Sequence, residues 1–251
     1  MKRYPKQDSV FFYSKKYQYL HKTNIMSILI TNIKQLLQVH DHNVTLVKGE
    51  AMKSLPVLEN AYLYIEHDTI IEYGLMADCE GIEAETTIDA TGKIVLPSWC
   101  DSHTHIVYAE DRTSEFIDRI NGLDYEEIAK NGGGILNSAE KLQNMSEDEL
   151  FEQAEKRLND LIAMGTGAVE IKTGYGLTVE AELKMLKVIK KLKQESMAKI
   201  VPTLLAAHAI PTEYRTHKKD YVKRIIEELI PKAAELEIAN YIDVFCEKEY
   251  F

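Results

Sequence analysis

Residues 94–108 read IVLPSWCDSHTHIVY, an apolar, strand-like run that contains two histidines separated by one residue. Side chains alternate between the two faces of a β-strand, so residues two apart point to the same side. His103 and His105 are therefore expected to converge. Two neutral imidazoles on a rigid strand can supply half of a four-ligand metal shell, and imidazole suits zinc, iron and nickel.

A structural role is the competing interpretation of this pair, and spacing alone does not separate the two. His40 and His42 have the same spacing but lie in a polar stretch, so we interpret them as part of an exposed turn. Around the later pair the sequence differs, because Pro97 predicts a turn, Asp101 adds a carboxylate and the upstream segment is rich in β-forming residues. These flanks favour a metal site.

The segment LPSWCDSHTH, residues 96–105, resembles the opening strand motif of the amidohydrolase superfamily, whose usual form is close to PGxxDxHxH. Ser98 stands where a glycine is usual, a change that affects the turn and not the ligands. The resemblance to one family of that superfamily, imidazolonepropionase, runs from about Met26 to the last residue. It is carried, in order and spacing, by HTHIVYAEDRTSEF at 103–116, NGGGI at 131–135, VEIKTGYGL at 169–177 and AAHAIPTEY at 206–214.

This resemblance implies a metal-dependent enzyme that hydrolyses the cyclic amide of 4-imidazolone-5-propanoate to N-formimidoyl-L-glutamate in histidine degradation. It implies a single metal ion, zinc or iron, held in part by His103 and His105. The acid/base residue of the family is expected beyond Phe251. Substrate contacts are implied for three residues: Arg112, Tyr175 and His208.

The residue types at the substrate positions fit these roles. The planar guanidinium of Arg112 can hold a propionate carboxylate through two hydrogen bonds. Gly174 and Gly176 flank Tyr175 and permit a tight turn that presents its ring. Small alanines surround His208 and leave room beside the imidazole. From the residues alone, a surface arginine, a turn tyrosine and a buried histidine are the alternatives.

Two further features are weaker candidates. The run Gly132-Gly133-Gly134 could cradle an anion, but no strand directly precedes it and a flexible loop is favoured. Lys172 could act as a carbamylated bridge between two metals, as in some two-metal relatives. Its place on the second expected barrel strand, where the fourth is usual, argues against that role. Glu170 shares its strand face, so we expect the two to pair.

Composition limits the class of protein. With 251 residues, 45% hydrophobic and 28% charged, the chain is an ordinary globular sequence, long enough for one large domain or two small ones. A net charge of −10 argues against a nucleic-acid partner. No apolar run approaches the roughly 18 residues of a membrane helix. Three widely spaced cysteines suit a reducing cytosol, so a cytoplasmic enzyme with a small-molecule substrate is expected.

The chain divides into three expected segments. Residues 1–25 carry six Lys or Arg against one Asp, and we expect a disordered or mis-assigned extension. Residues 26–93 predict a small antiparallel β domain, which the resemblance identifies with part of a β-sandwich. Residues 94–251 alternate helices and strands, the pattern of an α/β barrel. Capping boxes are expected at the starts of two helices, from Asp124 with Glu127 and from Ser146 with Glu149.

The resemblance and the length together predict an incomplete barrel. About 160 residues follow Ile94, whereas a complete (β/α)8 TIM-like barrel takes about 250 residues. We therefore expect a chain truncated after about four βα units, which lacks further family ligands and is inactive by itself. Another cyclic amidase or aminohydrolase of the superfamily, and a non-catalytic fragment, remain the alternatives. For the complete enzyme we consider a homodimer.

Overall fold

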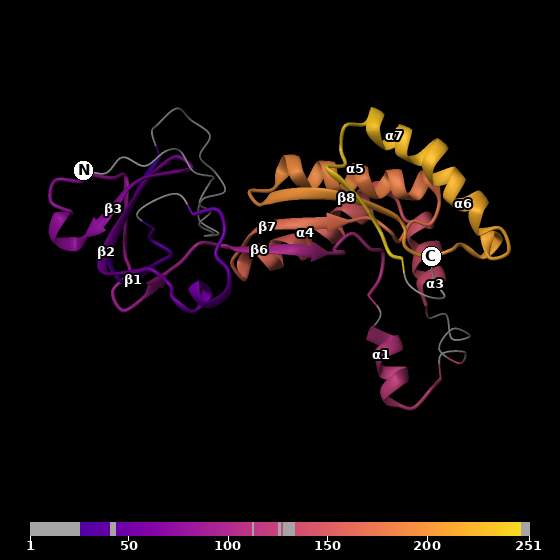
Figure 1. Ribbon diagram of the computed structural model, residues 1–251, viewed down its shortest axis with the longest axis horizontal. Coiled ribbons are helices and arrows are strands. Elements are labelled where there is room, and N and C mark those ends of the chain that lie inside the picture. Colours follow the sequence, from indigo (N-terminus) through magenta and orange to yellow (C-terminus); the bar gives the residue numbers. More distant parts are fainter. Residues whose placement is uncertain (1–25, 41–43, 112, 125–126, 128–133, 247–251) are drawn as a thin grey trace. The chain divides into compact units, whose positions relative to one another are not determined.

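The computed structural model describes residues 26–40, 44–111, 113–124, 127 and 134–246 (Figure 1). The chain forms two compact units that divide between Ser98 and Trp99. One unit is a β-sheet and the other combines a parallel sheet with helices, which confirms the α/β class. The expected extension at residues 1–25 lies outside the described residues. Among the described residues, no helix has the length and apolar character needed to cross a membrane.

The first unit is a mixed five-stranded sheet with the order β3-β2-β1-β4, in which β5 also pairs with β1. Its apolar side chains, which include Ile33 and Ala61 with no exposed surface, form a core cluster of their own. The strands are β1 (Ser27–Leu37), β2 (Val57–Glu66), β3 (Thr69–Leu75), β4 (Thr86–Asp89) and β5 (Ile94–Val95), and short 3-10 turns lie at Gly49–Lys53 and Met76–Asp78.

The expectation of an antiparallel domain is wrong for two of these strands. A tight turn at His67, where φ is 53°, reverses the chain between β2 and β3, so these strands pair antiparallel. The segment after β3 instead carries the chain past β2 to β1, and β4 runs parallel to β1. Strand β5 is also parallel to β1, with Gln35 opposite Ile94. Ile94 and Val95 therefore belong to the first unit.

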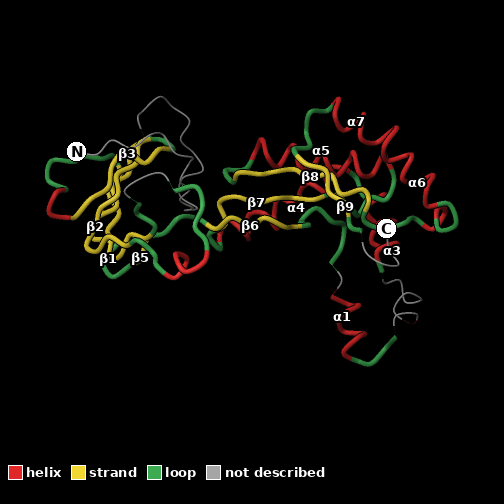
Figure 2. Tube along the Cα trace, viewed as in Figure 1, coloured by secondary structure: helices red, strands yellow, loops and turns green. Residues whose placement is uncertain are grey.

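The second unit contains four parallel strands in the order β6-β7-β8-β9, which lie side by side in Figure 2. Each strand pairs with the next along the chain, and helices connect them, as repeated βα units require. The strands are β6 (Trp99–Thr104), β7 (Thr166–Lys172), β8 (Lys199–Ala207) and β9 (Tyr241–Val244). The helices are α1 (Thr113–Ile120), α3 (Ile135–Asn144), α4 (Glu147–Ala163), α5 (Val179–Glu195), α6 (Lys218–Arg224) and α7 (Ile230–Glu235), with a 3-10 turn at Thr212–Tyr214.

Helices α4 and α5 cover one face of this sheet and form its main core. Leu150, Leu158 and Ile189 are almost fully buried there, against Val169 and Ile171 of β7. Burial of each such side chain contributes about 1.5–3 kcal/mol. Because side chains alternate along a strand, the residues between these apolar positions point to the opposite face. That face carries the polar residues described below.

The ends of the helices follow the sequence signals. The reciprocal hydrogen bonds of both expected capping boxes are present. Ser146 accepts a hydrogen bond from the Glu149 N–H and Glu149 accepts one from the Ser146 N–H. Asp124 and Glu127 likewise each accept a hydrogen bond from the other's N–H. The chain leaves α4 through Gly165, whose φ of 99° favours glycine. Before Pro231 the helix widens into a π turn over Ile225–Leu229. Proline has no N–H to donate to the preceding turn, so the widening occurs where its ring enters the helix.

Candidate metal and substrate site

Four of the five candidate site residues lie together at the carboxyl ends of the parallel strands. The ring centroids of His103 and His105 are 5.5 Å apart. The ring of His105 is 5.3 Å from that of Tyr175 and 5.8 Å from that of His208. The ring centroids of Tyr175 and His208 are 5.6 Å apart, in an edge-on arrangement. Arg112 lies outside the described residues, as does the family's expected acid/base position.

Parallel strand pairing brings these residues together. His105 directly follows β6, Tyr175 lies in the loop after β7, and His208 directly follows β8. Neighbouring strands run in the same direction, with Thr104 opposite Ile171 and Lys172 opposite Thr203, so their carboxyl ends share one edge. Loops at this edge carry the active sites of βα barrels.

His105 is suited to hold a metal ion. Its Nδ1 atom is buried and has no hydrogen-bond partner among the described residues, which marks a place for a ligand or an ion. Burial lowers the pKa of His105 to about 4, and repulsion by His208, His103 and Lys172 acts in the same direction. The imidazole is therefore neutral near pH 7, with a lone pair that can bind a metal.

Polar residues on the sheet face opposite α4 and α5 form a hydrogen-bonded network close to the histidines. The Lys172 ammonium donates to Glu170 Oε1 at 3.0 Å and to Asp243 Oδ2 at 2.9 Å, and Thr203 donates to Glu170 at 2.6 Å. Burial by itself lowers the pKa of Lys172, but the hydrogen bonds to Asp243 and Glu170 outweigh it and raise the pKa. The expected pairing of Lys172 with Glu170 is confirmed. A protonated amine held in this way is a poor candidate for carbamylation.

Two residues near the site were not among the candidates. Asp243 lies on β9 and reaches Lys172 across the sheet, a contact that no local pattern signals. Glu182 is fully buried in α5 beside the loop that carries Tyr175. A signal for it does exist in the sequence, because Glu182 falls on the same helical stripe as Val179, Leu186 and Ile189. A carboxylate in an apolar stripe predicts a buried partner.

His103 and His105 are a pair, not a complete metal shell. Within the described ranges, no group of three or more His, Cys, Asp or Glu side chains is arranged to hold a metal ion. The Gly134 N–H donates to the buried carboxyl group of Glu115 at 2.8 Å, so it is occupied within the chain and is not offered to an external anion. Residues 132–133 of the glycine run lie outside the described residues.

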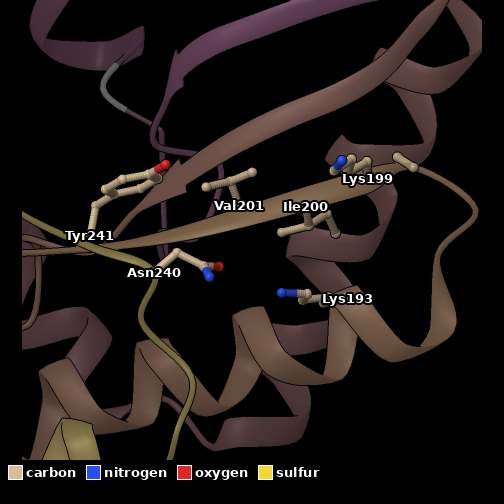
Figure 3. A pocket seen from close by; sticks show the side chains of 7 residues that line it. Lys193, Lys199, Ile200, Val201, Asn240 and Tyr241 are labelled. Atoms are coloured by element: carbon tan, nitrogen blue, oxygen red, sulfur yellow. The ribbon is translucent and has the colours of Figure 1, made fainter. Parts of the chain in front are cut away.

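A hollow of about 340 Å³ lies at the opposite ends of the strands (Figure 3). Residues from the start of β8, such as Lys199 and Val201, line it together with Asn240 and Tyr241 at the start of β9 and Lys193 at the end of α5. None of these is a candidate site residue. The hollow is therefore separate from the histidine cluster.

The chain is similar to curated imidazolonepropionases. It is 58% identical over 226 residues to the imidazolonepropionase of Christiangramia forsetii and 53% identical to that of Flavobacterium johnsoniae, in each case over 90% of this chain and 55% of the relative. The Clostridium tetani imidazolonepropionase is 42% identical over 81% of this chain and 49% of its own length. The chain thus spans about half the length of the curated relatives it matches.

Other comparisons concern the fold. No protein-family model matches the chain. The crystal structure of 5-methylcytosine deaminase from Klebsiella pneumoniae, liganded with 5-fluorocytosine, is similar with a TM-score of 0.51 at 15% sequence identity. The match covers 87% of this chain and 51% of that one. At this identity the likeness supports a shared arrangement of strands and helices.

Proposed function

This chain belongs to the imidazolonepropionase family over the 90% of its length that matches these relatives, and on that premise we propose its reaction. The protein contributes to hydrolysis of the cyclic amide of 4-imidazolone-5-propanoate, which gives N-formimidoyl-L-glutamate in histidine degradation. The observation that carries the proposal is the convergence of four side chains at the carboxyl ends of adjacent parallel strands: His103, His105, Tyr175 and His208. This convergence occurs in a chain that is 58% identical to an imidazolonepropionase.

We propose that the parallel sheet is the first half of a (β/α)8 barrel. Four parallel strands in sequential order, with α4 and α5 on one face, agree with a barrel wall. The opposite face is lined by Lys172, Glu170 and Thr203, which would then point into the barrel interior. The mixed sheet of the first unit is proposed to be part of the β-sandwich that accompanies such barrels.

The proposed metal ligands in this chain are His103 and His105. The neutral state of His105 and its unpartnered Nδ1 atom fit this role. A bound zinc or iron ion supplies hydroxide near neutral pH, by lowering the pKa of water. We attribute the remaining ligands and the acid/base residue to the part of the relatives that this chain does not match. By itself the chain is proposed to bind metal weakly and to be inactive.

The remaining site residues are proposed to bind the substrate. Tyr175 and His208 flank His105 and would orient the imidazolone ring beside the metal. Arg112 is proposed to anchor the propionate through paired hydrogen bonds. The three cysteines are free, which agrees with a cytosolic enzyme. A homodimer of the complete enzyme stays a proposal.

The test compares two purified proteins. One is this chain, and the other is this chain completed by the segment of the Christiangramia forsetii relative that lies outside the match. We expect about one metal ion per chain and imidazolonepropionate hydrolysis only in the completed protein. Metal binding without hydrolysis, together with activity on another cyclic amide or an amine, would assign a different amidohydrolase reaction. Absence of metal from both proteins would favour a non-catalytic fragment.

The anchoring role of Arg112 has its own test in the completed protein. Arg112→Ala is expected to raise KM for imidazolonepropionate by at least about tenfold, because a charged hydrogen-bonded pair contributes about 1.5–3 kcal/mol. The matched control is Arg119→Ala, which changes an arginine of α1. An unchanged KM in Arg112→Ala, measured by steady-state kinetics, would remove Arg112 from the site.

A further inference from the structure

Glu182 is a fully buried carboxylate of the second unit that the proposed function leaves unused. Its side chain has no exposed surface. Oε1 accepts hydrogen bonds from the N–H groups of Gly176 at 2.7 Å and Leu177 at 3.0 Å, and Oε2 accepts one from Gly174 at 3.0 Å. A buried carboxylate is costly unless hydrogen bonds compensate it. Glu182 is therefore placed to hold the loop between β7 and α5.

The loop is built to lie close to this carboxylate. Gly174 has a φ of 114°, which a glycine adopts without strain. A Cβ at Gly176 would lie 2.6 Å from the Glu182 nitrogen, so the loop can approach α5 only with glycine at this position. Thr178 caps the helix by accepting from the Ala181 N–H at 3.2 Å. Tyr175 thus lies between two glycines whose N–H groups are both held by Glu182.

The same loop fixes the protonation of His208. Nδ1 of His208 lies 2.9 Å from the carbonyl oxygen of Gly174. A carbonyl can only accept, so Nδ1 must carry the proton in this contact. In the neutral imidazole, Nε2 is then unprotonated and can accept a hydrogen bond. The tautomer of His208 therefore depends on the position of the Gly174 carbonyl group. The N–H of the same residue is held by Glu182.

We propose that Glu182 is a positioning residue of the histidine cluster. Its carboxylate holds the Gly174–Leu177 loop, which presents Tyr175 and, through the Gly174 carbonyl, selects the Nδ1–H tautomer of His208. Nε2 of His208 is thereby kept as an acceptor for a ligand. The assignment of that ligand as imidazolonepropionate rests on the proposed function; the tautomer itself does not.

The direct test is nuclear magnetic resonance of the chain labelled with ¹⁵N-histidine. Long-range correlation spectra at pH 8 identify which ring nitrogen carries the proton, and His208→Gln assigns the signal. We expect the Nδ1–H form in the wild-type chain. An Nε2–H form of His208 in the wild-type chain would overturn the proposal without any variant of Glu182.

Glu182→Gln tests the cause. A glutamine keeps one acceptor for Gly176 and Leu177 but places its NH2 group against the Gly174 N–H, so two donors face each other. We expect a loss of the pure Nδ1–H signal and a mixture with the Nε2–H form. Glu180→Gln makes the same chemical change at an exposed position of the same helix and is expected to leave the signal unchanged. A pure Nδ1–H signal in folded Glu182→Gln would refute the role of Glu182.

A second variant covers the case in which Glu182→Gln does not fold. Glu182→Asp keeps the charge but shortens the side chain, so it cannot reach all three N–H groups. We expect it to shift the tautomer part of the way, whereas an unshifted tautomer would count against the proposal. In the completed protein, Glu182→Gln is expected to lower kcat/KM by about 10- to 100-fold, which is the usual effect of replacing a residue that supports a metal ligand through hydrogen bonds. If the completed wild-type protein does not hydrolyse imidazolonepropionate, the proposed function fails while the tautomer result stands.

Discussion

The two ends of the parallel strands β6 to β9 differ in their chemistry. At the carboxyl ends, His105 lies within 5.8 Å of the rings of Tyr175 and His208, and Glu182 holds the loop beside them. At the amino ends there is a hollow of about 340 Å³, with Lys193 and Lys199 in its lining (Figure 3). The amino ends of the strands thus provide a hollow, whereas the carboxyl ends provide convergent side chains that can bind and orient a ligand.

This difference shows that space alone does not mark the candidate site. Parallel strands place all their carboxyl ends at one edge, so the polar residues that follow each strand meet there. The residues at the amino ends come from the last turn of α5 and from the first residues of β8 and β9. Their side chains include no convergent pair of metal-binding groups. Convergence of chemical groups is therefore the better guide.

The largest expected difference between the two ends concerns metal binding. His105→Ala in the completed protein is expected to weaken zinc binding by more than about 100-fold. Replacing a residue that only hydrogen-bonds to a metal ligand already lowers metal affinity by about 10- to 100-fold. Zinc titration followed by calorimetry measures the affinity. The control Lys193→Ala with Lys199→Ala changes the other end and should leave the affinity unchanged. Equal losses in both proteins would erase the distinction between the ends.

The next largest effect concerns the hydrogen-bonded network close to the histidines. Lys172→Met removes a cation held by Glu170 and Asp243. Loss of one partner costs about 3–5 kcal/mol in a fully buried pair, and we expect about 2 kcal/mol here, because the Asp243 side chain is 42% exposed. Urea unfolding measures this free energy. Lys223→Met, which breaks an exposed pair with Glu227, is expected to change stability by less than about 1 kcal/mol.

The same variant has a defined pH dependence. The hydrogen bond from Lys172 holds the pKa of Asp243 below its ordinary value, so its stabilising effect is present above about pH 4 and is lost as pH falls through the lowered pKa. The pKa of Lys172 is raised, so its effect is present below about pH 10 and is lost as pH rises through the raised pKa. The stability difference between wild type and Lys172→Met should narrow at both extremes. A constant difference would contradict the ion pair.

The smallest expected effect separates folding from function at the carboxyl ends. Ser146→Ala removes the side-chain cap of α4, which begins near the same edge as the histidine cluster, and should lower the free energy of unfolding by about 1 kcal/mol. Zinc affinity of the completed protein should not change. Glu149→Gln is the conservative control, since glutamine also completes a capping box. A change of zinc affinity in Ser146→Ala would show that the site is not confined to the residues described.

Short-range signals predicted much of this fold. The capping box of Ser146 and Glu149 and the alternation of helices and strands could be predicted, because each depends on residues only a few positions apart. The same holds for His103 and His105, whose convergence follows from the two-residue period of a strand. The resemblance of whole motifs then linked these residues to Tyr175 and His208, which no spacing rule connects.

Contacts between distant residues required the tertiary structure. Lys172 meets Asp243 across 71 positions, and His208 meets Gly174 across 34. The parallel pairing of β4 with β1 also depends on how the chain crosses the sheet, so the composition of these strands could not predict it. Local hydrogen bonds and periodicity act within a few residues, whereas these contacts depend on which strands become neighbours. The residues of the candidate site and the burial of Glu182 are thus visible in the sequence, whereas the partners that distant residues find, such as Asp243 for Lys172 and Gly174 for His208, are visible only in the fold.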